Sequence, residues 1–425
     1  MIPARAREST AQRFTTEVDR WVTAAVKAGI HSFDKLLTAL PGVYPVEVLE
    51  SVHRLVAARL ADPSLLARVR ESAEQPRVAR GVRRSRAPFL VPHPLDFDWR
   101  FAGSAVEHLL DIVSHVAGSS ETVLLLGAPT LFAASVERDL TNRVVLLDKS
   151  ASVIRSLESA PPKGSVIRCD LMVDSLPSLR GRVVVVDPPW YEEYLRSFLW
   201  ASSTMCEVGG QVLLSVPPNG TRPGVREEVE RLLIWSKSLG LELQRVESGV
   251  LPYLSPPFER NALRAAGIES VPEQWRRGSL AVFSKVAEST APRPQQELAR
   301  EDEWAEYTFD GVRVRVRGSP PSLVVFEDPS LISIVPNDVL PSVSRRDPRR
   351  LSVSIWTSRN RVFSCHGIGT LHHVFLALSS SRSPSEAIAF QLSRPLGARE
   401  VELVARASTK IRELVATEQA EALLH

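Results

Sequence analysis

The sequence has few cysteines, no long apolar run and little net charge. Its three cysteines, Cys169, Cys206 and Cys365, are widely spaced, which argues against a disulfide framework and for a reducing, cytoplasmic environment. No stretch approaches the roughly 20 consecutive apolar residues of a membrane span, and the first residues, MIPARAREST, lack the apolar core of a secretory signal. A formal charge of +3 is too small to imply a nucleic-acid partner by itself.

The length and composition indicate a soluble globular protein with more than one domain. Hydrophobic residues make up 44% of the 425 residues and charged residues 24%, and single cores rarely grow past roughly 250–300 residues. We expect an N-terminal helical module with an arginine-rich linker, an α/β core, a short linker and a C-terminal α+β domain. Their expected ranges are 1–89, 90–287, 288–303 and 304–425.

The N-terminal part has apolar residues at helical spacing in three short segments, 18–30, 32–42 and 44–62. This pattern suits a helix-turn-helix or winged-helix-like module, and it fits any small helical bundle equally. The following segment, Arg68–Arg86, holds seven arginines and two glutamates. It could contact phosphates, or it is a solvated linker, which its proline and glycine favour.

Residues 90–287 alternate between apolar strands and amphipathic helices, the pattern of a parallel sheet covered on both faces. Ligands of such sheets bind beyond the carboxyl ends of the strands. Four of the predicted strands end at Gly127, Asp148, Asp170 and Asp187. After residue 300 the apolar residues instead alternate with a period near two, before a helical tail, which indicates the smaller α+β domain.

The first three strand ends have the chemistry of a nucleoside-binding site. Gly127 stands between a strand and a helix, where free backbone N–H groups and the helix dipole meet a ligand. Asp148, about twenty residues later, can accept both hydroxyls of a ribose, and Asp170 is positioned for an adenine amino group. In this order of strands and residues the region resembles the class I S-adenosylmethionine (SAM) methyltransferases, which implies a Rossmann-like fold and SAM as cofactor.

The loop LLLGAPTLF departs from that family because it keeps one glycine of the usual Gly-x-Gly. The methionine part of the cofactor would then be held differently, or not at all. A nicotinamide-dependent dehydrogenase is the competing interpretation of such a fold. It requires the fuller G-x-G-x-x-G pattern, which the sequence lacks.

The fourth strand, VVVV, runs into Asp187, Pro188, Pro189 and Trp190. This Asp-Pro-Pro-Trp run resembles the catalytic motif of amino-methyltransferases that modify adenine N6 or cytosine N4. The resemblance implies that the Asp187 carboxylate and the Pro188 carbonyl each accept one N–H of a poorly nucleophilic amine. The two prolines restrict the backbone and aim that carbonyl, while Trp190 stacks on a planar acceptor.

Two observations bear on this interpretation of the motif. Asp187 could merely cap the following helix, with Trp190 filling a gap in the core. In the adenine methyltransferases best known for the motif, it precedes the SAM loop in the chain, whereas here it follows. The motif alone therefore does not secure a nucleic-acid target.

The branched-chain polyamine synthases fit this order better. They join a winged-helix-like module to a class I fold that has a strand, a Gly-Asp-Asp-Asp loop and a later Asp-Pro-Pro-aromatic helix start, and residues from about 20 to 218 resemble this layout. The acidic triplet is replaced by Ala128, Pro129 and Thr130. Since carboxylates would hold a polycationic amine, their loss argues against a polyamine acceptor.

Two further segments carry polar groups. Residues 252–279 form a long insertion between the last two predicted strands. This insertion could close over an anionic or aromatic acceptor and contact it through Arg260 and Asn261. Alternatively, it is an ordinary loop that packs against the core without a role in binding. Tyr191, beside the motif, is a further candidate for binding the substrate. The run CHGIGTLHH (Cys365–His373) lacks the spacing of a zinc site and is better explained by a strand end and a helix start.

We therefore expect a cytoplasmic, SAM-dependent methyltransferase that binds no metal and acts on an amino group. The leading acceptor is nucleic acid, DNA or RNA, or a small amine or nucleotide-like molecule. Two alternatives remain open: an aminopropyl transferase related to the branched-chain polyamine synthases, and a non-catalytic binding scaffold with a degenerate cofactor pocket.

Overall fold

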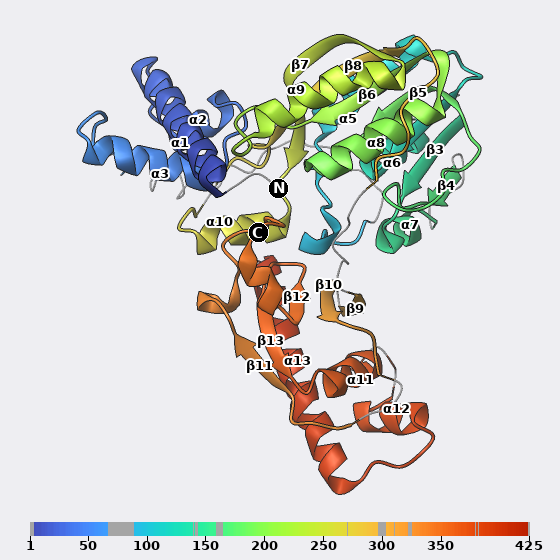
Figure 1. Ribbon diagram of the computed structural model, residues 1–425. Coiled ribbons are helices and arrows are strands. Elements are labelled where there is room, and N and C mark those ends of the chain that lie inside the picture. The colour runs from blue at the N-terminus through green and yellow to red at the C-terminus, as the bar shows by residue number, and fades with distance from the viewer. Residues whose placement is uncertain are drawn as a thin grey trace. The chain divides into compact units, whose positions relative to one another are not determined.

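The computed structural model describes residues 4–66, 89–138, 140, 143–158, 165–269, 271–295, 303–309, 311–321, 325–378, 380 and 382–423. These residues form two compact units, each with its own core (Figure 1). The first unit contains the described residues within 1–90, 99–255 and 268–297. The second contains those within 91–98, 256–267 and 298–425.

Three helices open the first unit: α1 (Ala4–Lys27), α2 (Phe33–Ala39) and α3 (Pro45–Ala57). Ser32 caps α2, because its side chain accepts the Lys35 N–H at 3.4 Å, and Pro45 occupies the first turn of α3, where proline costs no hydrogen bond. Between 4 and 66 the structure contains helices and no strand. The predicted helical module is confirmed here, although no strand of a wing lies within that range.

An eight-stranded sheet forms the body of the first unit, in the order β1-β7-β8-β6-β5-β2-β3-β4. Strands β4, β3, β2, β5 and β6 are parallel, whereas β8 and β1 run antiparallel to their neighbours. The strands are β1 (Arg100–Phe101), β2 (Thr122–Leu126), β3 (Arg143–Asp148), β4 (Ser165–Arg168), β5 (Gly181–Val186), β6 (Cys206–Val216), β7 (Leu241–Leu254) and β8 (Arg277–Lys285).

Helices cover both faces of this sheet (Figure 1). Val123 and Leu125 of β2 point to a core shared with α5, α6 and α7, while the alternate residues Leu124 and Leu126 point to a core shared with α8 and α9. The helices are α5 (Gly103–Val116), α6 (Pro129–Glu137), α7 (Ala151–Glu158), α8 (Glu192–Met205) and α9 (Val225–Trp235). The predicted Rossmann-like α/β core is confirmed by this topology.

The second unit holds an antiparallel sheet in the order β11-β13-β12-β10-β9, with helices packed against it. Its strands are β9 (Trp304–Phe309), β10 (Val312–Arg317), β11 (Ser330–Ser333), β12 (Ile355–Thr357) and β13 (Val362–His366). Its helices are α10 (Pro257–Ala265), α11 (Ile368–Leu378), α12 (Pro384–Gln391) and α13 (Ala398–Leu423). The predicted C-terminal α+β domain is confirmed. No helix in the described ranges has both the length and the apolarity needed to cross a membrane.

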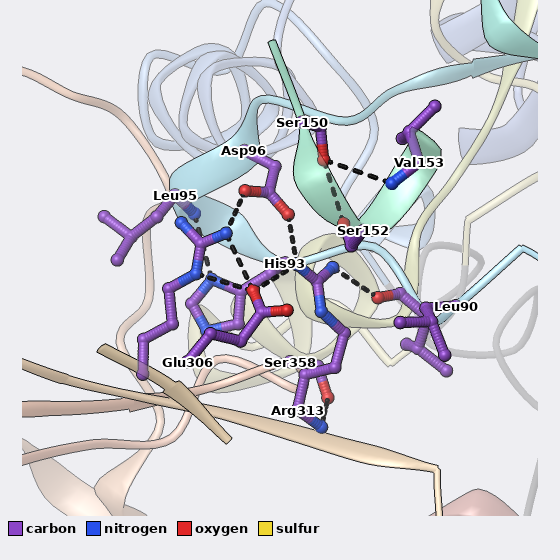
Figure 2. Close-up of polar contacts among 12 residues, drawn as sticks. Leu90, His93, Leu95, Asp96, Ser150, Ser152, Val153, Glu306, Arg313 and Ser358 are labelled. Atoms are coloured by element: carbon purple, nitrogen blue, oxygen red, sulfur yellow. Dashed lines mark hydrogen bonds and ion pairs between the residues drawn. The ribbon is translucent and has the colours of Figure 1, made fainter. Parts of the chain in front are cut away.

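A buried cluster of charges ties residues 91–98 to this second sheet (Figure 2). Arg313, whose side chain is 1% exposed, donates to Asp96 and to Glu306, at 2.6 Å in each case. Arg315 pairs with the same two carboxylates. His93 lies beside them with its Nε2 3.0 Å from the Trp356 carbonyl oxygen, and burial lowers the pKa of this histidine well below its usual value.

One expectation for the second unit fails. Residues 325–328 were expected within a strand but have no regular structure, because the Glu327 N–H and C=O bond to the Thr370 hydroxyl, each at 3.0 Å, instead of to a neighbouring strand. The strand end and helix start expected at Cys365–His373 are confirmed, since this run spans the end of β13 and the start of α11. Helix α12 lies in a stretch that the sequence pattern did not assign.

Candidate active site

The sheet brings Gly127 and Asp187 together, because β2 and β5 are neighbours and pair Leu126 with Val186. Gly127 has a φ of +67°, and its N–H donates to the Leu147 carbonyl at 2.9 Å. A Cβ at this position would lie 3.0 Å from the Asp187 carbonyl oxygen and 3.3 Å from the Phe198 ring. Glycine is therefore required here for both its backbone conformation and its small size.

Asp148 is the last residue of β3 and Asp170 follows β4, and both lie at the same edge because β3 and β4 are parallel neighbours. The turn into α7 fixes the Asp148 carboxylate, whose Oδ1 accepts the Ser150 N–H at 2.7 Å. Ser150 also caps α7, with its hydroxyl 3.4 Å from the Val153 N (Figure 2). Asp170 accepts the Met172 N–H at 3.0 Å, and Lys149 Nζ lies 3.8 Å from its other oxygen.

A chain of hydrogen bonds links Asp187 to the indole of Trp190. The Tyr253 hydroxyl donates to Asp187 Oδ1 at 2.6 Å and lies 2.6 Å from the Ser215 hydroxyl. Ser215 Oγ in turn accepts the Trp190 Nε1–H at 3.2 Å. The four side chains come from the ends of β5, β6 and β7, strands that the sheet order sets close together at one edge.

Only one direction of proton donation satisfies this chain. An indole N–H can only donate and an ionised carboxylate can only accept. The Ser215 hydroxyl must therefore donate a hydrogen bond to Tyr253 Oη, and the Tyr253 hydroxyl donates a hydrogen bond to Asp187. Burial, and then the Asp187 charge, raises the pKa of Tyr253 well above its usual value, so the phenol remains a donor throughout the neutral pH range.

Sequence reasoning missed Tyr253 and Ser215 because neither belongs to a local motif. They stand 66 and 28 residues from Asp187 and act on it only after the strands have paired. The available signal was positional. Ser215 lies near the carboxyl end of a predicted apolar strand, where the ligands of such sheets bind, whereas Tyr253 lies in the predicted insertion 252–279, whose first residues belong to β7 in the structure.

No family model matches the chain, and no curated protein matches it. Among solved structures it is similar to a branched-chain polyamine synthase mutein from Thermus thermophilus, with a TM-score of 0.49, 14% identity, and coverage of 69% of this chain and 95% of that one. It is also similar to a TehB-like SAM-dependent methyltransferase from Corynebacterium glutamicum, with a TM-score of 0.31, 16% identity, and coverage of 43% of this chain and 88% of that one. A putative RNA methyltransferase from Pyrococcus horikoshii gives a TM-score of 0.34, 18% identity, and coverage of 47% of this chain and 93% of that one.

Trp190 is almost wholly enclosed, with 8% of its surface exposed. Its ring meets Tyr253 edge to face at 5.4 Å, and the Arg276 guanidinium lies over it at 4.6 Å. A Cβ at Gly278 would come within 2.9 Å of the indole. These contacts favour a role for Trp190 in holding the site in place, while its stacking on an acceptor stays a prediction.

The N-terminal module contributes one aromatic ring, Tyr44, to a group of aromatic side chains in the first unit. The Gly220 N–H donates to the Pro41 carbonyl at 2.8 Å, which joins the loop after β6 to the loop after α2. Tyr44, just before α3, packs its ring against Trp275 at 5.9 Å, and Trp275 packs against Trp99 at 6.3 Å. The helical module is thus part of the site region rather than a separate appendage.

The remaining candidates lie elsewhere or keep only a predicted role. Tyr191 precedes α8, and its N–H donates to the Pro189 carbonyl at 2.8 Å. Arg260 and Asn261 lie on α10 in the second unit, where the Asn261 amide donates to the Arg359 carbonyl at 2.9 Å. Substrate binding by these three residues stays a prediction.

Two other expectations concern phosphates and metals. The Arg68–Arg86 segment lies outside the residues that the structure describes. Within the part of the chain that the structure describes, no three His, Cys, Asp or Glu side chains are grouped so that they could hold a metal ion.

Proposed function

We propose that this chain is a SAM-dependent methyltransferase that acts on an amino group. The proposed acceptor is a nucleic-acid base or a nucleotide-like molecule. The observation that carries the proposal is the Asp187 carboxylate, which follows a strand and accepts the Tyr253 hydroxyl at 2.6 Å, while the backbone carbonyl of the same residue lies against Gly127. A residue that merely capped α8 would need no such buried support from two other strands.

The residues at the neighbouring strand ends fit the cofactor. Gly127 keeps this strand end free of a side chain that would crowd the Asp187 carbonyl and Phe198, and α6 begins two residues later with Pro129 in its first turn. Asp148 would accept the ribose hydroxyls and Asp170 would meet the adenine amino group. SAM, when bound, supplies a methyl group made electrophilic by its sulfonium. The single glycine of the loop leaves the binding of the methionine part to backbone groups from Gly127 to Thr130.

The chain's own residues act on the amine of the acceptor. Asp187 and the Pro188 carbonyl would each accept one of its N–H bonds, which raises electron density on a nitrogen otherwise conjugated to its ring. Pro188 and Pro189 limit backbone motion, so the carbonyl keeps its direction. Tyr253 and Ser215 hold one carboxylate oxygen in place, so that Asp187 presents a fixed acceptor without reorganising.

Two measurements on the full-length protein test this function. Calorimetric titration with SAM should show binding, whereas a scaffold with a degenerate pocket should show none. Transfer of labelled methyl from SAM to fractionated cellular RNA, DNA, protein and small molecules should then label a nucleic-acid or nucleotide fraction. Label in polyamines alone would reject this acceptor class, and SAM binding with no label in any fraction would reject the transfer reaction.

A further inference from the structure

Arg222 begins a tight turn in the loop between β6 and α9. The sequence RPGV, Arg222–Val225, favours a type II turn, with proline at its second position and glycine at its third, where φ must be positive. Gly224 has a φ of +77°, and the Val225 N–H donates to the Arg222 carbonyl at 3.3 Å, which closes the turn. The chain continues directly into α9, whose first turn carries Glu228.

The Arg222 side chain joins Glu228 to the backbone of Trp190. Its Nη1 donates to Glu228 Oε1 at 2.8 Å, and its Nη2 donates both to Glu228 Oε2 and to the Trp190 carbonyl oxygen, the latter at 3.0 Å. The arginine and glutamate side chains are only 14% and 12% exposed. Paired hydrogen bonds between a guanidinium and a carboxylate are strong and fix the plane of the arginine. The donor to the Trp190 carbonyl is therefore a rigid group.

The N-terminal module also contacts this loop. A Cβ on Gly220 would lie 2.6 Å from the Pro41 carbonyl oxygen, and one on Gly42 would lie 2.4 Å from Pro218 Cγ. Within the loop, the Thr221 hydroxyl donates to the Pro218 carbonyl at 2.8 Å. Such close packing of backbone against backbone leaves the loop little room to move. Arg222 thus reaches Trp190 from a fixed base.

One segment of chain consequently holds Trp190 at two points. The indole N–H donates to Ser215, near the end of β6, at 3.2 Å, and the carbonyl accepts from Arg222, in the loop after the same strand. The preceding carbonyl, that of Pro189, accepts the Tyr191 N–H at 2.8 Å. These bonds fix the turn that follows Pro188.

The two prolines of the motif narrow the direction of the Pro188 carbonyl without fixing it. A residue that precedes proline keeps a ψ of roughly 120–160°, and rotation within that range still swings its carbonyl oxygen. The remaining freedom is removed by whatever holds the backbone on either side. On the C-terminal side, Arg222 is the side chain that bonds to the backbone of Trp190.

We propose that Arg222 is a positioning residue for methyl transfer. By holding the Trp190 carbonyl it fixes the turn from Pro188 to Tyr191, and with it the direction in which the Pro188 carbonyl meets the acceptor amine. This inference rests on the proposed methyltransferase function. Arg222 acts through the backbone and does not touch the reacting atoms. A misaligned acceptor stabilises the transition state less, so its loss lowers the rate of transfer rather than the affinity for either substrate.

Selective isotope labelling tests the contact without any reaction. Trp190–Tyr191 is the only Trp-Tyr pair in the sequence. Full-length protein labelled with carbonyl-¹³C tryptophan and ¹⁵N tyrosine therefore gives one cross-peak, which joins the Trp190 carbonyl carbon to the Tyr191 amide. Arg222→Met keeps most of the side-chain length and removes every donor, so the carbonyl carbon should shift upfield. Arg226→Met is the matched control, because that exposed arginine of α9 pairs with Glu230 at 3.1 Å, and it should leave the peak in place.

Kinetics test whether the contact serves the reaction. The assay is single-turnover transfer of labelled methyl from SAM to the cellular fraction that the wild-type protein methylates. Arg222→Met should lower the rate at saturating acceptor by about tenfold or more. The half-saturating amount of that fraction and the calorimetric affinity for SAM should stay within about twofold, as for a lost transition-state interaction. Arg222→Lys keeps the charge and one donor, so its rate should lie between those of Arg222→Met and wild type.

Three results would overturn the inference: an unmoved cross-peak in Arg222→Met, a wild-type rate in that variant, or a loss confined to binding of SAM or of the acceptor fraction. If Arg222→Met does not fold, Arg222→Lys replaces it, because lysine cannot make all three bonds of the guanidinium. A smaller upfield shift with a reduced rate then supports the inference, and an unchanged peak or rate overturns it. A wild-type protein that methylates no fraction would instead reject the proposed function, and the positioning role with it, whereas an active wild type beside a fully active Arg222→Met rejects the positioning role alone.

Discussion

The substitution Asp187→Asn tests the site most sharply, because it changes the hydrogen bonding of residue 187 at nearly constant size. In the wild-type protein Tyr253 donates to Asp187. An asparagine that keeps this hydrogen bond turns its oxygen toward Tyr253 and its NH₂ group toward the acceptor amine. The substitution keeps size and packing but replaces an acceptor of the amine N–H with a donor.

We expect this change to lower kcat by about 100-fold or more, equivalent to roughly 2.7 kcal/mol or above of lost transition-state stabilisation. SAM affinity should stay nearly unchanged, because Asp187 acts on the acceptor. The assay is single-turnover transfer of labelled methyl to whichever acceptor the fractionation identifies. Near-normal turnover by Asp187→Asn would reduce Asp187 to a helix cap and refute the catalytic account.

A double variant separates two effects of Asp187→Asn: the donor group turned toward the acceptor amine, and the loss of the negative charge. Tyr253→Phe removes the hydroxyl that holds the asparagine oxygen, so the amide can turn and present that oxygen to the amine. Asp187→Asn with Tyr253→Phe should therefore turn over faster than Asp187→Asn alone, although Tyr253→Phe by itself should lower kcat. If the two substitutions lower kcat additively in the double variant, the proposed direction of hydrogen-bond donation from Ser215 through Tyr253 to residue 187 is contradicted.

Four further predictions concern the cofactor, the linker and the second unit. Asp148→Ala should weaken SAM binding by roughly 1.5–3 kcal/mol, as for a hydrogen bond to a charged group, and unchanged affinity by calorimetry would exclude its ribose role. If the Arg68–Arg86 segment contacts phosphates, the logarithm of nucleic-acid affinity should fall linearly and steeply with that of salt concentration; a salt-insensitive complex, or none, would make it a plain linker. Asp96→Ala leaves the buried Arg313 with one carboxylate partner fewer and should destabilise the second unit by about 3–5 kcal/mol in urea unfolding, whereas a loss below 1 kcal/mol would show that the cluster relaxes. Burial raises the pKa of Glu418 to about 7, so its contribution to stability is fully present below its unfolded value near 4.5 and is lost as pH rises to 7; Glu418→Gln should make the unfolding free energy less dependent on pH between 4.5 and 7, and parallel pH profiles of the two proteins in that range would contradict this.

The local pattern of the sequence was sufficient for the first unit's architecture. Four β-branched residues before Asp187 and the amphipathic segments on either side specify a buried strand between helices, because hydrophobic periodicity depends only on neighbouring residues. The same patterns place Gly127, Asp148 and Asp170 just after strands. In the second unit the pattern was weaker, since the backbone of Glu327 bonds to Thr370 and the local sequence gives no signal of that partner.

By itself, then, the sequence determined the alternation of strands and helices, the α/β class and the carboxylates at the strand ends. Only the tertiary structure decided which groups surround those carboxylates. Tyr253 reaches Asp187 across 66 residues of chain, and Arg313 reaches Asp96 across 217. Such partners meet because strand order and register bring them to one place, and neither is encoded in the spacing of residues along a single segment. The placement of Arg276 over Trp99 and Trp190 has the same origin, since an antiparallel strand must begin where its parallel neighbours end.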